Sequence, residues 1–464
     1  MKADSLEARI GARIFWSAYD PLDLASNSID PLGFARGYLA LADLFLPGLT
    51  TVTRTPRYVS MLCAAIRVAE DSFPHAGFPV PAKVRQERLD AVKSFERAWA
   101  LACGLAAQAV GERRVPGLLG VRSIQRVLDS LSQREKYIQT RSFNLLSNQV
   151  QYGGLGAYST LIEEFHLAAM PFLSLRPIGR KLAATFPLPP FKLHQPDARI
   201  PLVTLEKWGS LVHPETLIDA ESNLLAEVLN GGEEQEHSDR VRSASLRWLA
   251  SRWQQREWDE GQLLAALANG IESANIRSEA LPKWNSQILV TLRIIDPYER
   301  FYQSALFVFH SILASVTELL EVSLTKISAK NEIKETFSAL QKHALALKRQ
   351  LSECETIDDI TTKSLRTVLT ESGICSLADA VLDAADASEV TRGILDRHGQ
   401  VQSGKFDRGM PKPAWIRLSG KADNVQLTAQ RHGLAQAPAK WSDVARHSYR
   451  IGSAFSFIHF CKIK

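Results

Sequence analysis

The sequence lacks most of the short motifs that mark an enzyme. Its 464 residues contain no G-x-x-x-x-G-K-[ST] phosphate-binding loop, no H-E-x-x-H metal pair and no G-x-S-x-G nucleophile turn. The five cysteines stand apart, without a C-x-x-C pair, and predict buried thiols rather than a zinc site or a disulfide framework. These absences favour a protein without catalytic activity, cofactor or bound metal.

The chain also lacks a long apolar run. Its most apolar stretch, from Ala305 to Val322, is interrupted by polar residues such as His310, Ser315 and Glu318. A membrane span needs about 20 mostly apolar residues, so this stretch predicts a buried helix. The N-terminus shows no secretory signal pattern. We therefore expect a cytoplasmic protein with no membrane partner.

Charge is unevenly distributed, although the net charge is only +5. Residues 83–143 hold 12 Lys/Arg against 6 Asp/Glu, and residues 388–464 hold 13 against 5. Between them, residues 215–260 hold 11 acidic against 5 basic residues. Two basic regions around an acidic one are typical of a protein that binds a polyanion, and DNA is the partner we expect. Charged helix surfaces without a binding function would produce the same pattern.

Helical periodicity dominates the sequence and predicts a mainly α, multi-domain helical protein. Proline- and glycine-rich stretches divide the chain, and the clearest is the proline-rich link from Phe186 to Pro201. The expected segments are an N-terminal helical domain (1–115), a winged-helix-like module (116–190), a helical segment with an acidic loop (191–285), a long-helix domain (286–387), and a basic loop with a small β-hairpin and a closing helix (388–464).

The order of predicted elements within 116–190 resembles a winged-helix module. Two helices, a glycine turn, a third helix and a short hairpin lead into "LSLRPIGRKLA". If this module contacts DNA, Arg176, Arg180 and Lys181 are its candidate phosphate contacts. Winged helices also serve as protein-binding modules, and the sequence leaves both roles open.

A basic stretch from Arg397 to Trp415 is the second candidate contact with nucleic acid. Its phosphate-binding candidates are Lys405, Arg408 and Lys412, and Trp415 is a candidate for stacking on a base. We expect this stretch to be a polar loop. A histidine in such a loop can act as a general base, so a nuclease or other hydrolase with an unfamiliar site near His398 is an alternative.

The stretch "DPLGFARGYLALADLFLPGLTTVTRTPRYVSM", from Asp30 to Met61, resembles the N-terminal signature of an uncharacterised prokaryotic family. Members carry D-x-L-G…R…AD-x-L-F-P-G-x-[ST]-x-x-T-R-x-R-Y. The tail "HSYRI", from His447 to Ile451, is similar to the Tyr-Arg pair that closes such proteins. The matching residues of the first stretch are Asp30, Leu32, Gly33, Arg36, Ala42, Asp43, Phe45, Pro47, Gly48, Thr53, Arg54, Arg57 and Tyr58.

Members of that family sit in defence islands beside helicases and nucleases, so the resemblance implies a role in phage defence and supplies no catalytic residues. Within the matching stretch, Arg54 and Arg57 are either phosphate contacts or partners of internal acids. The leading hypothesis is a non-catalytic, DNA-binding adaptor subunit of a prokaryotic antiviral defence system. Its protein partner would be a helicase, another ATPase or a nuclease. A scaffold that binds only protein is the other alternative.

Overall fold

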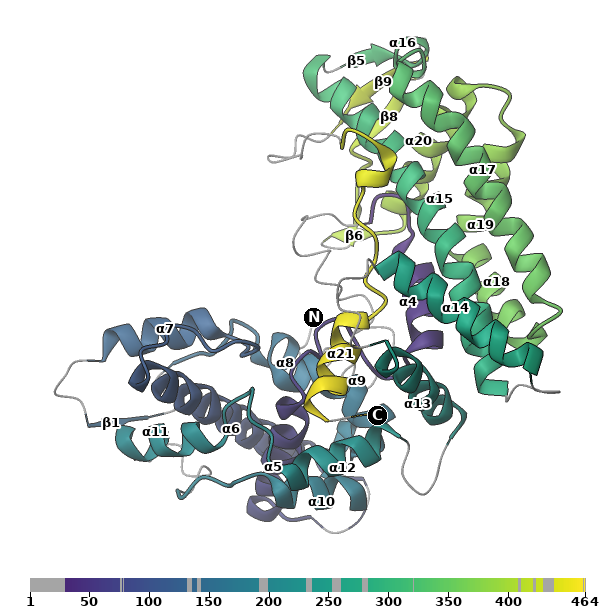
Figure 1. Cartoon of the computed structure of the whole chain (residues 1–464). Helices are drawn as coiled ribbons and strands as arrows, with labels where there is room; N and C mark the ends of the chain where they lie inside the picture. Colours follow the sequence, from purple (N-terminus) through teal and green to yellow (C-terminus); the bar gives the residue numbers. More distant parts are fainter. Residues whose placement is uncertain are drawn as a thin grey trace. The chain divides into compact units, whose positions relative to one another are not determined.

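The computed structural model is dominated by helices (Figure 1). The residues that it describes form 18 α-helices and only short strands, which confirms the mainly helical prediction. No helix among them is both long and apolar enough to cross a membrane. The described residues are 30–75, 77, 79–131, 136–139, 143–191, 199–230, 236–252, 260–277, 283–319, 321–407, 410–419, 423–428, 438–461 and 463.

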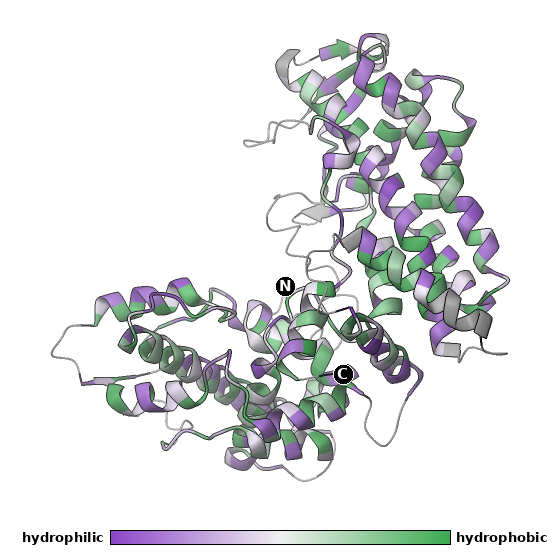
Figure 2. Ribbon diagram, viewed as in Figure 1, coloured by the Kyte–Doolittle hydropathy of each residue, from purple (hydrophilic) through white to green (hydrophobic). Residues whose placement is uncertain are grey.

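The chain folds into two compact units, each built from separate stretches of sequence. Unit 1 holds the described residues of Leu46–Arg256 and Arg450–Lys464, and unit 2 holds those of Pro21–Phe45 and Glu257–Tyr449. The stretch that resembles a family signature therefore contributes to both units. Most helices show apolar and polar residues on different sides, as expected when one face is buried (Figure 2).

Unit 1 is organised around the long helix α6. Its alanine-rich face allows α5 and α11 to pack closely against it. At Gly209 of α11 a Cβ atom would clash with the Ala102 carbonyl of α6, so glycine is needed for this approach. The helices are α5 (Arg57–Ser72), α6 (Ala82–Ala109), α7 (Val121–Ser130), α8 (Gln149–Tyr152), α9 (Gly154–Glu164), α10 (Pro177–Thr185), α11 (Leu202–Leu211), α12 (Asp219–Leu229), α13 (His237–Ala250) and α21 (Ile451–Phe460).

The strands of unit 1 are very short. Strand β1 (Tyr137–Ile138) pairs antiparallel with β4 (Ile200–Pro201). Strand β2 (Ala168–Ala169) pairs with β3 (Ser174–Leu175) around the 3₁₀ turn η2 (Met170–Phe172). Helix α7 packs on α6, and α10 packs on α5. The elements of 116–190 therefore share the core of unit 1, and the winged-helix interpretation remains a prediction.

Unit 2 is centred on α15, which packs along α17 and α14. Strand β9 lies between β5 and β8 in an antiparallel three-stranded sheet. The helices are α4 (Ala35–Phe45), α14 (Glu260–Arg277), α15 (Lys283–Leu319), α16 (Leu324–Ser328), α17 (Asn331–Cys354), α18 (Asp359–Glu371), α19 (Ile374–Asp383) and α20 (Ala387–Ser403), with the 3₁₀ turn η3 (Trp441–Asp443). The strands are β5 (Glu321–Ser323), β6 (Phe406–Asp407), β7 (Met410–Pro411), β8 (Ile416–Ser419) and β9 (Asn424–Leu427).

The stretch that starts at Arg397 is not the loop that its polar composition suggested. Arg397, His398 and Gln402 belong to the last turns of α20. Four buried residues of this helix, Val390, Ile394, His398 and Gln402, recur every four positions and form its buried face. Two of these are polar, which hid the helical pattern in the sequence.

Candidate nucleic-acid interface

Arg57, one of the two arginines predicted from the signature stretch, is an internal residue. Its side chain is 0% exposed, and its Nη1 lies 3.2 Å from Oε2 of the equally buried Glu221 in α12. Its Nη2 donates to the Leu211 carbonyl (3.1 Å), and its guanidinium lies 5.2 Å from the Phe186 ring centroid. Burial lowers the pKa of Arg57 and raises the pKa of Glu221, because both charged forms lose hydration. Arg57 is thus an ion-pair partner and not a surface group.

The start of the signature stretch builds the N-terminus of α4. The Asp30 carboxylate accepts hydrogen bonds from the backbone N–H groups of Gly33 (2.7 Å), Phe34 (2.9 Å) and Ala35 (2.7 Å). Gly33 has a left-handed φ of 78° and lies directly under the guanidinium of Arg397, where a Cβ would clash. These residues therefore stabilise the local fold and do not form a surface binding site.

The tail that resembles the family's Tyr-Arg closure packs on the same stretch. In unit 2, Nδ1 of His447 lies 2.7 Å from Oε1 of Glu299, and the Tyr449 hydroxyl donates to the same oxygen (2.5 Å). The Tyr38 ring stacks on His447 with centroids 4.3 Å apart. In unit 1, Nη1 of Arg450 donates to the Leu46 carbonyl (3.2 Å). Both ends of the resemblance are thus explained by packing.

The basic C-terminal region also directs several candidate residues inward. Nζ of Lys405 donates to the Asp30 carbonyl (2.7 Å). Trp415 is buried, and Lys412 is half-buried. Arg408 lies outside the described residues. Lys405 and Trp415 therefore do not present the open side chain that a phosphate or base contact requires.

His398 has a structural role as well. It is fully buried, its Nδ1 lies 3.0 Å from the Pro31 carbonyl, and its Nε2 accepts a hydrogen bond from the backbone N–H of Trp415 (3.0 Å). This pairing places the proton on Nδ1 of a neutral ring. Burial lowers the pKa of His398 to about 4. Because both ring nitrogens are engaged, the structure offers no general base at this position.

The candidates on α10 are exposed, but two of them have partners. Arg180 is 52% exposed and its Nη2 lies 3.0 Å from Oε2 of Glu70. Nη1 of Arg176 lies 3.2 Å from Nδ1 of His166. Lys181 is exposed. This helix offers positive charge that is partly neutralised.

A positive surface without ion pairs among the described residues lies around the C-terminal end of α6. Arg113 and Arg114 follow α6, while Arg122 and Arg126 stand one turn apart on α7, and all four are exposed. None of the four makes an ion pair with any residue that the structure describes. We call these four residues the arginine surface. The nearby acidic residues are Glu112 and Asp129, so positive charge prevails.

The loop that carries Arg113 and Arg114 is held firmly against the start of α5. The Thr55 hydroxyl donates to the Gly117 carbonyl (3.1 Å), and the Leu119 N–H donates to the Tyr58 hydroxyl (2.7 Å). Arg54 is exposed and adjacent to Thr55, with its Nε donating to the Thr51 carbonyl (3.1 Å). Arg54 therefore borders the arginine surface, and of the two arginines predicted as phosphate contacts in the signature stretch, Arg54 and Arg57, only Arg54 is exposed.

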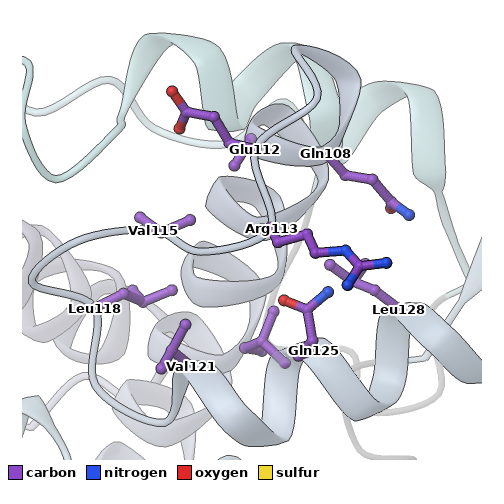
Figure 3. Close-up of a pocket in the computed structure, with 11 residues that line it drawn as sticks. Gln108, Glu112, Arg113, Val115, Leu118, Val121, Gln125 and Leu128 are labelled. Carbon is purple, nitrogen blue, oxygen red and sulfur yellow. The ribbon is translucent and has the colours of Figure 1, made fainter.

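A small surface pocket lies between α7 and the C-terminal end of α6, and Arg113 is one of the residues that line it (Figure 3). The pocket is small and partly open to solvent. Apolar side chains from Val115, Leu118, Val121 and Leu128 line it, and Figure 3 shows the Arg113 and Gln125 side chains approaching each other across it.

Sequence reasoning found the basic region 83–143 but did not select these four arginines. Two signals were present: the Arg113-Arg114 doublet after a long helix, and Arg122 and Arg126 at a spacing of four on the polar side of α7.

No protein-family model, curated protein or solved structure matches the chain. Among the described residues, no three His, Cys, Asp or Glu side chains gather as a metal site requires.

Proposed function

We propose that the protein binds DNA through phosphate contacts made by the arginine surface, with Arg54 at its border. The observation that carries this proposal is the set of four exposed guanidiniums around one helix end of unit 1, none of which forms an ion pair with a residue that the structure describes. Guanidinium groups match phosphate oxygens in charge and geometry. Such contacts bind a backbone without reading its sequence.

Two features support a phosphate ligand at this surface. The loop is fixed by hydrogen bonds to Thr55 and Tyr58, so little ordering is needed on binding. Helix α7 begins at Val121, next to Arg122, and its N-cap Gly120 has no side-chain oxygen to accept a hydrogen bond from the first N–H groups. A helix N-terminus favours an anion, and it adds to the attraction of the arginines.

The wider role remains the one the sequence suggested: a non-catalytic adaptor in antiviral defence, acting with a helicase, another ATPase or a nuclease. Its support is the resemblance of residues 30–61 and 447–451 and the absence of enzyme motifs. The hydrolase alternative loses its candidate base, because both nitrogens of His398 are engaged.

The test is binding of the purified chain to labelled duplex and single-stranded DNA across a salt series. We expect log affinity to fall linearly with log salt, with a slope of about 0.9 per duplex phosphate contact. Absence of binding at low salt would refute the proposal and leave a scaffold that binds only protein.

A further inference from the structure

The two-stranded ribbon formed by β1 and β4 presents an exposed aromatic residue beside positive charge. Tyr137 pairs across the ribbon with Pro201, and Ile138 pairs with Ile200. Side chains alternate between the faces of a strand, so the buried Ile138–Ile200 pair turns Tyr137 and Pro201 outward. Tyr137 is 54% exposed, the highest value for an aromatic side chain among the described residues.

The ribbon lies at the same end of α6 as the arginine surface. Helix α11 begins directly after β4, and its end is fixed by the Val212 carbonyl, which accepts from Nε1 of Trp99 (2.8 Å). Gly209 contacts Ala102, later in α6, so α11 runs antiparallel to α6. The start of α11 is about two turns, or roughly 10 Å, beyond Gly209 and lies near the C-terminal end of α6. Figure 1 shows β1, α7 and α11 gathered there.

The charges around Tyr137 match a polyanion. Lys136 precedes it, Arg199 precedes β4, and Lys207 lies on the outer side of α11, and all three are exposed. None of them makes an ion pair with a residue that the structure describes. The acidic residue nearby on α11 is the half-buried Glu206. An aromatic ring flanked by cations is a common arrangement for single-stranded nucleic acid, in which bases stack while cations follow the backbone.

We propose that Tyr137 is a stacking platform for an unpaired base, so that the α6 end prefers single-stranded over duplex nucleic acid. This inference rests on the proposed function, because the arginine surface would hold the backbone on which the stacked base is carried. A duplex keeps its bases paired inside, and its phosphates reach the arginines without using the ring.

The experiment compares an oligothymidine with a duplex of the same length by fluorescence anisotropy. Tyr137→Ala is expected to weaken oligothymidine binding roughly 5- to 100-fold, the range seen when a stacked aromatic is removed, and to change duplex binding less than about twofold. Tyr137→Phe, which keeps the ring, is expected to bind like the wild type. The matched control is Tyr152→Ala on α8, the other exposed tyrosine among the described residues.

The outcomes separate the two proposals. If Tyr137→Ala lowers the affinity for oligothymidine and for duplex equally, or does not lower the affinity for oligothymidine, the stacking inference is overturned. If a variant of the arginine surface loses binding in that same experiment, the proposed function still stands. If the wild-type chain binds neither ligand, both proposals fail. Circular dichroism of Tyr137→Ala establishes that the variant is folded.

Discussion

The two basic regions of the chain, 83–143 and 388–464, have similar excesses of Lys and Arg, but individual cations within them differ in exposure. In the second region, Arg397 and Lys405 donate to the backbone carbonyls of Leu32 and Asp30. In the first, Arg113 and Arg122 are exposed and make no ion pair with any described residue. Excess charge along a sequence is therefore not equivalent to charge available for a ligand.

The largest change in stability that we predict is for substitution of Arg57, because a buried arginine stabilises the fold rather than binding a ligand. Arg57→Leu leaves Glu221 buried without its counter-charge and should lower the free energy of unfolding by about 3–5 kcal/mol. Chemical denaturation followed by circular dichroism measures the loss. Arg54→Leu, at an exposed position, is the control and should change it by less than about 0.5 kcal/mol. A loss below about 1 kcal/mol for Arg57→Leu would contradict the internal role.

A pH series tests the buried histidine of the second region. Unfolded His398 takes up a proton near pH 6.5, while the folded state resists protonation until about pH 4. The unfolded state thus binds more protons in this window, and stability should fall as pH drops from 6.5 to 4, by up to about 3 kcal/mol from this group. His398→Asn should flatten the slope, although His343, with its pKa also lowered to about 4 by burial, still contributes. An unchanged slope would show that His398 titrates normally.

Arg397→Ala allows stability and DNA affinity to be compared in a single variant. It removes donors to the carbonyls of Leu32 (2.8 Å) and Ser372, and the expected loss of stability is about 1.5–3 kcal/mol. DNA affinity, measured at a temperature where the variant is folded, should change less than about twofold. A marked loss of DNA affinity without loss of stability would show that Arg397 contacts DNA rather than stabilising the fold.

The smallest effect is expected for Arg180→Ala. Its half-exposed pair with Glu70 should contribute less than about 1 kcal/mol to stability. Because Glu70 already neutralises Arg180, DNA affinity should fall less than it does for Arg122→Ala. Anisotropy titrations of the two variants at one salt concentration decide the order, and the reverse order would place the interface on α10.

The helical class of the fold was predicted from the periodicity of apolar residues. A surface position for Arg54, as a phosphate contact, was one of the two roles left open for it. Pairing with an internal acid was one of the two roles left open for Arg57, but its partner Glu221 was not predictable because it lies far along the chain in α12. The helical position of His398 was hidden by polar residues on the buried face of α20. The division into two units was hidden because each is built from separate stretches, which local composition does not reveal. Local pattern predicted elements, while long-range packing decided which charges are exposed.

The most direct measurement of the central claim is the salt dependence of duplex DNA binding by a variant with Arg113, Arg114, Arg122 and Arg126 all changed to Gln. Its matched control changes four ion-paired surface residues of unit 2 to Gln, namely the exposed Lys348, Arg349 and Lys363 and the partly exposed Arg366. Both variants lose the same charge. We expect only the first variant to lose affinity, by tenfold or more, with a log–log salt slope reduced by about 2–4. Equal losses in both variants, or an unchanged slope in the first, would contradict this expectation.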